Sequence, residues 1–144
     1  AIGKEEREDR ATKIMDLVGL TSCADLYPNQ VSASMMQRIA VSRAFAVNPD
    51  LLLMDEPYGQ LDVKLRFYLE DELVNIWRKL NSTVLFVTHN IEEAVYVAER
   101  ILVLTNKPTK IKAEIPVDLP RPRDLLNPKF IELRKEVTEL IRWW

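Results

Sequence analysis

The chain has 144 residues with 47% hydrophobic and 29% charged content, which is enough to build one globular domain around an apolar core. Its formal net charge of −2 argues against a nucleic-acid partner, because nucleic-acid-binding domains present basic surfaces. The single cysteine excludes an internal disulfide, and no apolar run approaches the roughly 20 residues of a membrane-spanning helix. The first residues are also unlike a signal peptide, so the composition fits a globular protein of a reducing compartment.

The first elements of the chain are predicted to be two helices joined by a polar turn. Residues 4–18 carry apolar side chains at helical spacing, and Gly19 is placed to end that helix. Ser32 is typical of a helix N-cap and predicts a second helix from about residue 33 to residue 47. Asn48-Pro49-Asp50 then closes this helix and leads into the next element.

A continuous apolar run at residues 51–54 ends in two adjacent carboxylates, Asp55 and Glu56. Such a run without alternation predicts a strand that is buried on both faces within a parallel sheet. Ligands of parallel α/β sheets bind at the carboxyl ends of the strands, which is where both acids stand. On these residues alone two interpretations remain open: a metal- and water-binding pair for phosphoryl transfer, or a solvated acidic turn.

The middle of the chain is predicted to alternate helices and strands. After a turn in which Asp62 is placed as a cap, a helix is expected to run to about residue 80, with one buried face. A second apolar strand follows at residues 83–87, then a helix at residues 91–98 and a strand at residues 100–105. This order predicts an α/β fold with right-handed parallel crossovers.

The tail of the chain has a different character. Residues 110–117 alternate weakly and are predicted to form an edge strand. A proline-broken loop follows, in which Arg121 and Arg123 are expected to be solvated, with contact to an anion or a partner as the alternative. Asn127-Pro128 supplies a cap and a first-position proline for a final amphipathic helix.

Polar side chains follow both buried strands. Thr88-His89-Asn90 follows the second strand as Asp55 and Glu56 follow the first. Phosphoryl transfer needs an acid for the metal, a group that orients water, and a polar group at the terminal phosphate. Asp55, Glu56 and His89 fit these roles in that order. The alternative for His89 is a structural hydrogen bond, and as the only histidine it argues against a zinc cluster.

Four groups of residues stand in a distinctive order along the chain. They are Tyr27-Pro28-Asn29-Gln30-Val31-Ser32-Ala33-Ser34-Met35-Met36-Gln37-Arg38, Leu51–Pro57, Gly59-Gln60-Leu61-Asp62 and Val87-Thr88-His89. In this order they resemble the signature helix, Walker B strand, D-loop and H-loop in the C-terminal half of an ABC transporter ATPase. The tail from Ile115 to Asp124 is similar to the nitrate, sulfonate and taurine importer subfamily. The resemblance implies a parallel-sheet half of a P-loop ABC ATPase core with flanking helices over residues 1–117, followed by the loop and final helix over residues 118–144.

The resemblance implies a role for each motif residue. Asp55 would bind Mg²⁺ through water, Glu56 would be the general base for the attacking water, and His89 would contact the γ-phosphate of ATP. Asp62 would link the two active sites across a dimer of ATPase subunits. The signature face would touch the γ-phosphate of the partner's ATP, because a helix N-terminus favours an anion. Its residues are Ser32, Ala33, Ser34 and Gln37.

Two departures from the family pattern bear on activity. The signature, usually LSGGQ or LSGGM, reads Val31-Ser32-Ala33-Ser34-Met35, and a Cβ at positions 33 and 34 obstructs close approach to a phosphate. The Ser34 hydroxyl is a partial substitute, and the alternative is a variant helix that still packs and docks weakly. The sequence also has only three glycines and no GxxxxGK[ST] loop. We therefore expect this chain by itself neither to bind ATP tightly nor to hydrolyse it.

The resemblance implies an ATP-hydrolysing, energy-coupling subunit of an importer for nitrate-, sulfonate- or taurine-type solutes, present here as a partial domain. The implied cofactors are ATP and Mg²⁺. The implied partners are a transmembrane permease subunit, a second ATPase subunit and, indirectly, a periplasmic or extracellular solute-binding protein. The implied location is cytoplasmic, on the inner face of the membrane.

The alternative is a non-catalytic truncated ATPase that acts as an interaction or dimerisation module, which the altered signature and the missing phosphate loop favour. A third interpretation, an ABC ATPase of DNA repair or translation, is weaker, because a long coiled coil or a basic surface would be expected and the sequence shows neither. A partial sheet would also expose strand edges and apolar faces, which favours self-association.

Overall fold

The computed structural model describes residues 2–59, 61, 63–80 and 82–142. The chain folds as two compact units, of which the first comprises Ala1–Met54 with Gln60–Leu85 and the second Asp55–Gly59 with Phe86–Trp144. The expected capping residue Asp62 lies outside the described residues, as does its neighbour Gln60.

The first unit begins with helices whose ends agree with the sequence prediction. Helix α1, Lys4–Leu17, is followed by Gly19 in the left-handed region at φ +65°, a conformation that glycine adopts without steric cost. Two short 3₁₀ turns, Thr21–Cys23 and Pro28–Gln30, then lead to α2. Helix α2, Ala33–Ala46, starts where Ser32 Oγ accepts the backbone N–H of Met35 at 3.3 Å, so the predicted N-cap is confirmed.

The apolar core of the first unit lies among three helices. Helix α2 contacts both α1 and α3, the latter spanning Val63–Lys79. On α3 the predicted buried face is confirmed, because Leu69, Leu73 and Ile76 are nearly inaccessible to solvent. Arg38 of α2 ties the helices together: its guanidinium donates to the Val18 carbonyl at 3.0 Å and lies over the ring of Tyr68. The other buried apolar residues of this unit are Ile14, Val18, Leu20, Val41 and Phe45.

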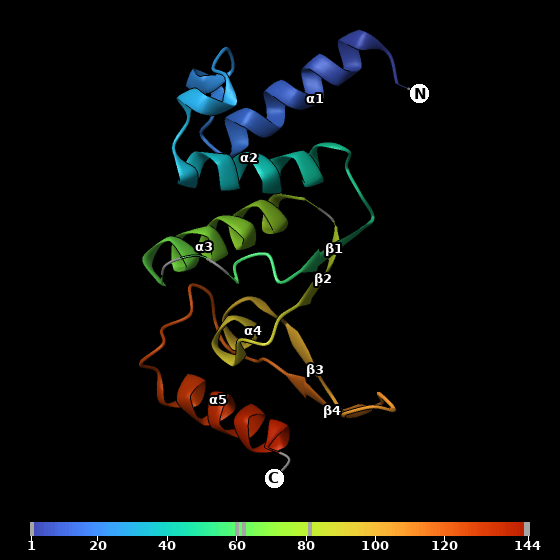
Figure 1. Ribbon diagram of the computed structural model, residues 1–144, viewed down its shortest axis with the longest axis vertical. Coiled ribbons are helices and arrows are strands. Elements are labelled where there is room, and N and C mark those ends of the chain that lie inside the picture. The colour runs from blue at the N-terminus through green and yellow to red at the C-terminus, as the bar shows by residue number, and fades with distance from the viewer. Residues whose placement is uncertain (1, 60, 62, 81, 143–144) are drawn as a thin grey trace. The chain divides into compact units, whose positions relative to one another are not determined.

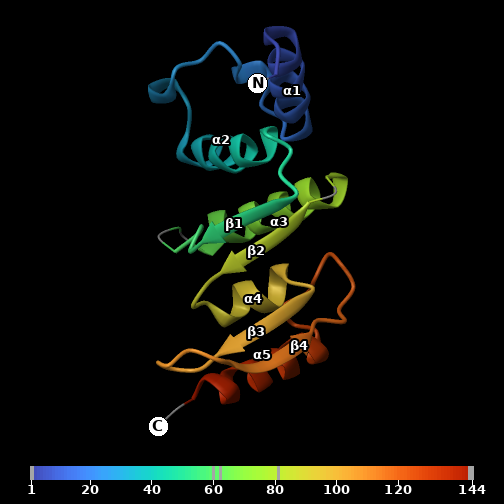
Figure 2. The ribbon, with the colours of Figure 1, turned by 90° about the vertical axis from the view of Figure 1, so that its right-hand side faces the viewer.

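Strands β1, Leu51–Asp55, and β2, Thr83–Val87, form a two-stranded sheet. The Thr83 N–H donates to the Asp50 carbonyl at the start of both strands, and the Glu56 N–H donates to the Val87 carbonyl at their end. The strands are therefore parallel, as predicted, and Figure 2 shows both arrows pointing the same way. Their carboxyl ends meet at one edge.

The prediction that the first strand is buried on both faces is wrong for this chain. Burial along β1 and β2 alternates, and the outer side chains of both strands are about half exposed or more. A strand becomes buried on both faces only when a layer of structure covers each side of the sheet. The exposed side chains are Leu51 at 54%, Leu53 at 65%, Leu85 at 50% and Val87 at 49%.

The second unit contains helix α4, Ile91–Val97, and a hairpin formed by β3, Arg100–Leu104, and β4, Ile111–Pro116. Strand β3 pairs antiparallel with β4, from Arg100 opposite Pro116 to Leu104 opposite Ile111, in a sheet separate from β1 and β2. The expectation of a third parallel strand is therefore wrong, whereas the predicted strand over residues 110–117 is confirmed. A short connection between neighbouring strands is sufficient for antiparallel pairing.

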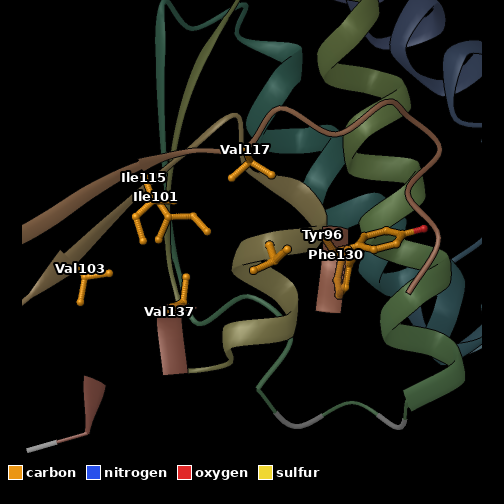
Figure 3. Close-up of a cluster of buried hydrophobic side chains, with 8 residues drawn as sticks. Tyr96, Ile101, Val103, Ile115, Val117, Phe130 and Val137 are labelled. Atoms are coloured by element: carbon orange, nitrogen blue, oxygen red, sulfur yellow. The ribbon is translucent and has the colours of Figure 1, made fainter. Parts of the chain in front are cut away.

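Helix α5, Pro128–Ile141, completes the second unit and packs against α4 and β3 (Figure 1). It begins as predicted, because Asn127 Oδ1 accepts the Lys129 N–H at 2.9 Å and Pro128 occupies the first turn. Figure 3 shows the side chains of α4, β3, β4 and α5 meeting in one core. Its buried members are Val95, Tyr96, Ile101, Val103, Ile115, Val117, Phe130 and Val137.

The Arg121/Arg123 pair is not a solvated loop, and this expectation is wrong for Arg123, which is 7% exposed. The carbonyls of the last three residues of α4 and of its C-cap Ala98 have no partner within the helix, and the two arginines donate to all four. Arg123 Nη1 lies 2.6–2.9 Å from the carbonyls of residues 95, 96 and 98, and Arg121 donates to the carbonyl of Val97. Arg123 Nη2 also donates to the Val117 carbonyl at 3.2 Å.

Burial lowers the pKa of Arg123 to about 10, and the charge of Arg121 lowers it as well. A group with this pKa still carries its charge at neutral pH. The position therefore holds a buried guanidinium cation at the negative end of a helix dipole.

In the described residues no helix combines the length and the apolarity needed to cross a bilayer.

Candidate functional site

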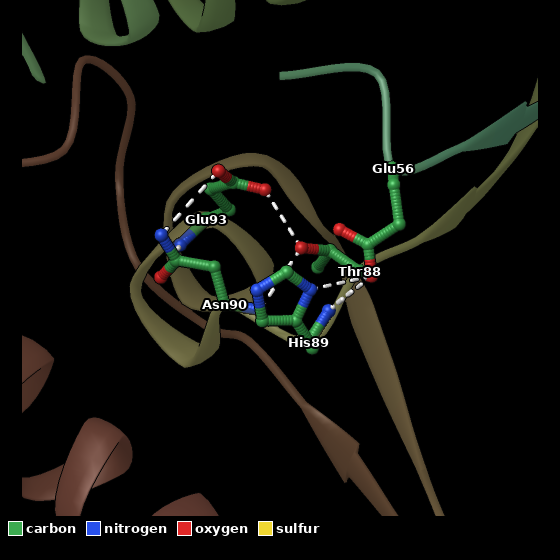
Figure 4. Close-up of polar contacts among 5 residues, drawn as sticks. All are labelled: Glu56, Thr88, His89, Asn90 and Glu93. Atoms are coloured by element: carbon green, nitrogen blue, oxygen red, sulfur yellow. Dashed lines mark hydrogen bonds and ion pairs between the residues drawn. The ribbon is translucent and has the colours of Figure 1, made fainter. Parts of the chain in front are cut away.

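The site is built on a direct contact between two side chains at the carboxyl edge of the parallel sheet. Glu56, directly after β1, accepts two hydrogen bonds on Oε1, from the backbone N–H of His89 and from His89 Nδ1, each at 2.8 Å (Figure 4). A carboxylate can only accept, so this contact selects the tautomer with a proton on Nδ1. The His89 side chain is 80% exposed and that of Glu56 38%, so a ligand in solution can reach both.

The backbone at Glu56 is held in an uncommon conformation, with φ +45°, which favours glycine. Strain of this kind persists only where the surrounding structure fixes it. Two contacts do so here: the Glu56 N–H is bound to the Val87 carbonyl at 2.9 Å, and the Gly59 N–H donates to the Glu56 carbonyl at 3.3 Å. Tyr58 anchors the same turn, since it is 2% exposed and its ring packs on Phe86 at 5.8 Å.

The turn that carries His89 is held by hydrogen bonds to a buried carboxylate. Glu93 of α4 is 3% exposed and accepts the Thr88 hydroxyl at 2.7 Å, and the Thr88 oxygen accepts the Asn90 N–H at 3.0 Å. Asn90 caps α4 by accepting the N–H groups of Glu92 and Glu93 at 3.0 and 3.4 Å. Figure 4 shows these residues forming one network around the histidine. His89 is thus fixed at both neighbouring residues and by its own backbone.

Asp55 ends β1 with an exposed carboxylate that pairs with no side chain among the described residues. The described residues contain no group of three side chains that would hold a metal by themselves. Mg²⁺ is usually bound through one or two carboxylates together with substrate phosphates and water. An unpaired carboxylate beside Glu56 fits that donor set, so Asp55 is the residue that would hold Mg²⁺ here.

The predicted signature residues lie in the first unit, at the start of α2. Ser32 and Ala33 are exposed, and Ser34 and Gln37 are partly buried. Ser32 Oγ accepts the Met35 N–H and also lies 3.0 Å from Ser34 Oγ. The Ser34 hydroxyl, the expected partial substitute for glycine, therefore hydrogen-bonds with the capping Ser32.

The structure brings together three of the predicted site residues, Asp55, Glu56 and His89, within the second unit. The signature residues belong to the other unit, and Asp62 lies outside the described residues. Sequence reasoning missed the role of Glu93, because nothing in its local pattern distinguishes a buried carboxylate from a solvated first-turn acid. The capping position of Asn90 directly before a helix was the available signal.

Sequence comparison with known proteins assigns the chain to a family. Residues 2–59 match the sequence profile of the ABC transporter family. The chain is 44% identical over 141 residues to an uncharacterized ABC transporter ATP-binding protein of Methanocaldococcus jannaschii, with 98% of this chain and 53% of that protein covered. The chain belongs to the ABC transporter ATP-binding family. It spans about half the length of the curated relatives that it matches.

Two further relatives of this ABC chain have named substrates. The nitrate import ATP-binding protein NrtD of Synechocystis is 35% identical over 148 residues, with 96% of this chain and 56% of the relative covered. The aliphatic sulfonates import ATP-binding protein SsuB of Bacillus licheniformis is 43% identical over 128 residues, with 89% of this chain and 50% of the relative covered. The predicted resemblance to nitrate and sulfonate importers is therefore confirmed at the level of sequence similarity.

The fold agrees with the sequence comparison. The crystal structure of an ABC transporter's ATP-binding cassette in its ADP conformation matches this chain with a TM-score of 0.70 at 23% identity. The match covers 92% of this chain and 51% of that structure. The predicted fold class, an α/β part of an ABC ATPase core with a parallel sheet and flanking helices, is therefore confirmed.

Proposed function

We propose that this chain supplies the water-activating part of an ATP-hydrolysing subunit that drives an importer of nitrate-, sulfonate- or taurine-type solutes. The observation that carries the proposal is the contact between Glu56 and His89 at the ends of two parallel strands. Membership of the ABC family and similarity to nitrate and sulfonate import proteins support the substrate class.

Glu56 acts as the general base. Its Oε1 is occupied by two hydrogen bonds from His89, and Oε2 has no hydrogen-bond partner among the described residues. Oε2 is therefore the atom that accepts a proton from the attacking water, while Oε1 holds the carboxylate in place. Bound Mg²⁺ and ATP supply the electrophile, a γ-phosphoryl group whose charge the metal neutralises.

His89 contacts the γ-phosphate through Nε2, because Nδ1 is held by Glu56. With Nδ1 protonated, Nε2 of the neutral ring accepts hydrogen bonds, and it donates only when the ring is an imidazolium. Donation to a phosphate oxygen therefore requires the protonated ring, whose charge the adjacent Glu56 carboxylate balances. Asp55 is the residue that would hold Mg²⁺.

We place the residues of the signature, Ser32, Ala33, Ser34 and Gln37, at the ATP of a second ATPase subunit, and Asp62 at the link between the two sites. A transmembrane permease subunit and, indirectly, a solute-binding protein are the other partners, and the location is the cytoplasmic face of the membrane. The functional division is a catalytic core over residues 1–117 and a tail over residues 118–144.

The test uses a hybrid protein in which this chain replaces the aligned 141 residues of the Methanocaldococcus jannaschii relative. The remaining part of that relative is expected to supply the phosphate loop that this chain lacks. The proposal predicts Mg²⁺-dependent ATP turnover by the hybrid and none by the 144-residue chain by itself. Turnover by the isolated chain that Glu56→Gln abolishes would contradict the second expectation.

The second candidate is a non-catalytic module that only docks or dimerises. The observation in its favour is the signature, where Ala33 and Ser34 place side chains at the positions usually held by glycine, and the Ser34 hydroxyl is taken up by Ser32. A hybrid that folds, dimerises and binds ATP without turning it over would support this candidate.

A further inference from the structure

Helix α4 is too short to hold its own position. It has seven residues, Ile91–Val97, and isolated helices shorter than roughly 12 residues are marginal in water. Its place is therefore set by its surroundings: the core contacts of Val95 and Tyr96, and the groups that bind its two ends. His89 lies two residues before its first turn, and Asn90, between them, caps the helix.

The C-terminal end of α4 is bound by the proline-broken loop. Arg123 and Arg121 together satisfy the four carbonyls that the helix leaves open, and Arg123 is itself buried. Arg123 also donates to the Val117 carbonyl, directly after β4. One guanidinium thus ties the end of α4 to the β3–β4 hairpin.

The N-terminal end of α4 is bound by helix α5. Arg134 Nη1 lies 3.0 Å from Glu92 Oε2, in the first turn of α4. The next residue, Glu93, is the buried acceptor of the Thr88 hydroxyl, and Asn90 closes the network on the other side of the histidine. Contacts from residues 118–142 therefore bracket the element that fixes the His89 turn.

We propose that the tail, residues 118–142, is a positioning element for His89 that acts through α4, with Arg123 holding one end of the helix and Arg134 the other. Neither arginine touches a reacting group. Their effect is to keep the backbone N–H and the ring Nδ1 of His89 in register with Glu56 Oε1. This inference rests on the proposed function only in giving His89 a role at the phosphate. Its test needs no ATP, so the positioning role and the proposed ATPase function can fail separately.

The chain offers a sharp probe, because His89 is its only histidine and gives one set of imidazole signals in an NMR spectrum. The measurement is amide hydrogen exchange at His89 and in α4, together with the His89 ring ¹⁵N shifts, in the 144-residue chain. The variant Arg123→Lys keeps the charge and loses the planar fork that reaches several carbonyls at once. We expect it to speed exchange at His89 and in α4 at least about tenfold, with β3 and β4 changed less.

Arg134 of α5 and Arg142, the C-cap residue of α5, form a matched pair of variants for the N-terminal end of α4. Arg134 pairs with Glu92 of α4 at 3.0 Å, and Arg142 pairs with Glu139 of its own helix at the same distance. We expect Arg134→Gln to speed exchange at His89 about threefold, in the range of an exposed ion pair, and Arg142→Gln to leave it unchanged.

The proposal is overturned if neither Arg123→Lys nor Arg134→Gln changes exchange at His89. It is also overturned if each raises exchange by one common factor throughout the second unit, because that result describes a purely structural role. Should Arg123→Lys unfold the second unit, the comparison of Arg134→Gln with Arg142→Gln decides the question by itself.

Discussion

Glu56 Oε1 lies 2.8 Å from both the backbone nitrogen and the ring Nδ1 of His89. One carboxylate oxygen therefore holds the turn after β2 at two atoms, one of them in the His89 side chain. If Glu56 is the general base and His89 the phosphate contact, as proposed above, the two residues are linked before any nucleotide binds. Such preorganisation lowers the reorganisation needed during catalysis.

The first prediction concerns this link. Replacing Glu56 by alanine removes the acceptor of both hydrogen bonds, so the ring ¹⁵N and backbone amide signals of His89 should shift toward those of a free histidine. Asp55→Asn is the matched control, because this neighbouring carboxylate has no side-chain partner among the described residues. Equal shifts in the two variants would show that the contact is not formed in solution.

The second prediction concerns the core that supports the site. Phe130 of α5 is fully buried against Tyr96 of α4, and its ring centroid lies 6.5 Å from that of the tyrosine. Phe130→Ala should lower the free energy of unfolding by about 3–5 kcal/mol, because it opens a large cavity. Ile131→Ala, at the neighbouring position that is 42% exposed, should cost less than about 1 kcal/mol. Urea unfolding followed by circular dichroism measures the free energy of unfolding of both variants. Similar losses in the two would show that α5 does not bury Phe130 in this core.

The third prediction concerns the exposed apolar face of β1 and β2. Leu53 and Leu85 are 65% and 50% exposed on a sheet, which favours self-association of the chain. The double variant Leu53→Thr, Leu85→Thr should lower the average mass measured by light scattering at high protein concentration. Leu126→Thr, in a loop where the leucine is 80% exposed, should not. A wild-type chain that is monomeric at all concentrations would refute this expectation.

The fourth prediction concerns the altered signature at the start of α2. Restoring glycine at positions 33 and 34 removes two Cβ atoms from the face expected at the partner's ATP, so turnover by the hybrid protein should rise. Ala33→Gly should also cost at most about 1 kcal/mol of stability, and Ser34→Gly less, because glycine is a poor helix former but serine is already a weaker one than alanine. An unchanged turnover would mean that Ala33 and Ser34 already meet the phosphate well. Alanine at position 34 separates the lost hydroxyl from the lost Cβ.

Local signals allowed much of this fold to be predicted. The sequence predicts Ser32 and Asn127 as caps, because a short polar side chain directly before an apolar run of helical period commonly accepts a backbone N–H of the first helical turn. Asp55, Glu56 and His89 were placed together because parallel strands end at one edge, and the structure confirms the contact between the last two. These inferences need only sequence spacing and the geometry of one element.

The errors share a different physical origin. The sequence predicts a solvated Arg123, since an arginine in a proline-broken loop carries no sign that a helix end will need its donors. Strand β3 was expected to extend the parallel sheet, and its pairing with β4 depends on tertiary competition between partners. The exposure of Leu53 depends on whether a second layer covers the strand. Each outcome is decided by groups distant in the sequence.

The most direct test of the central claim is ATP turnover by the hybrid protein with Glu56 and with Glu56→Gln. Glutamine keeps the size of the side chain and accepts the His89 hydrogen bonds, but it cannot take a proton from water. We expect a loss of turnover of at least about 100-fold, in the range of general-base removal, with Mg-ATP affinity unchanged within about threefold. Equal turnover in the two proteins would exclude Glu56 as the base, because the base would then lie outside the Glu56–His89 pair.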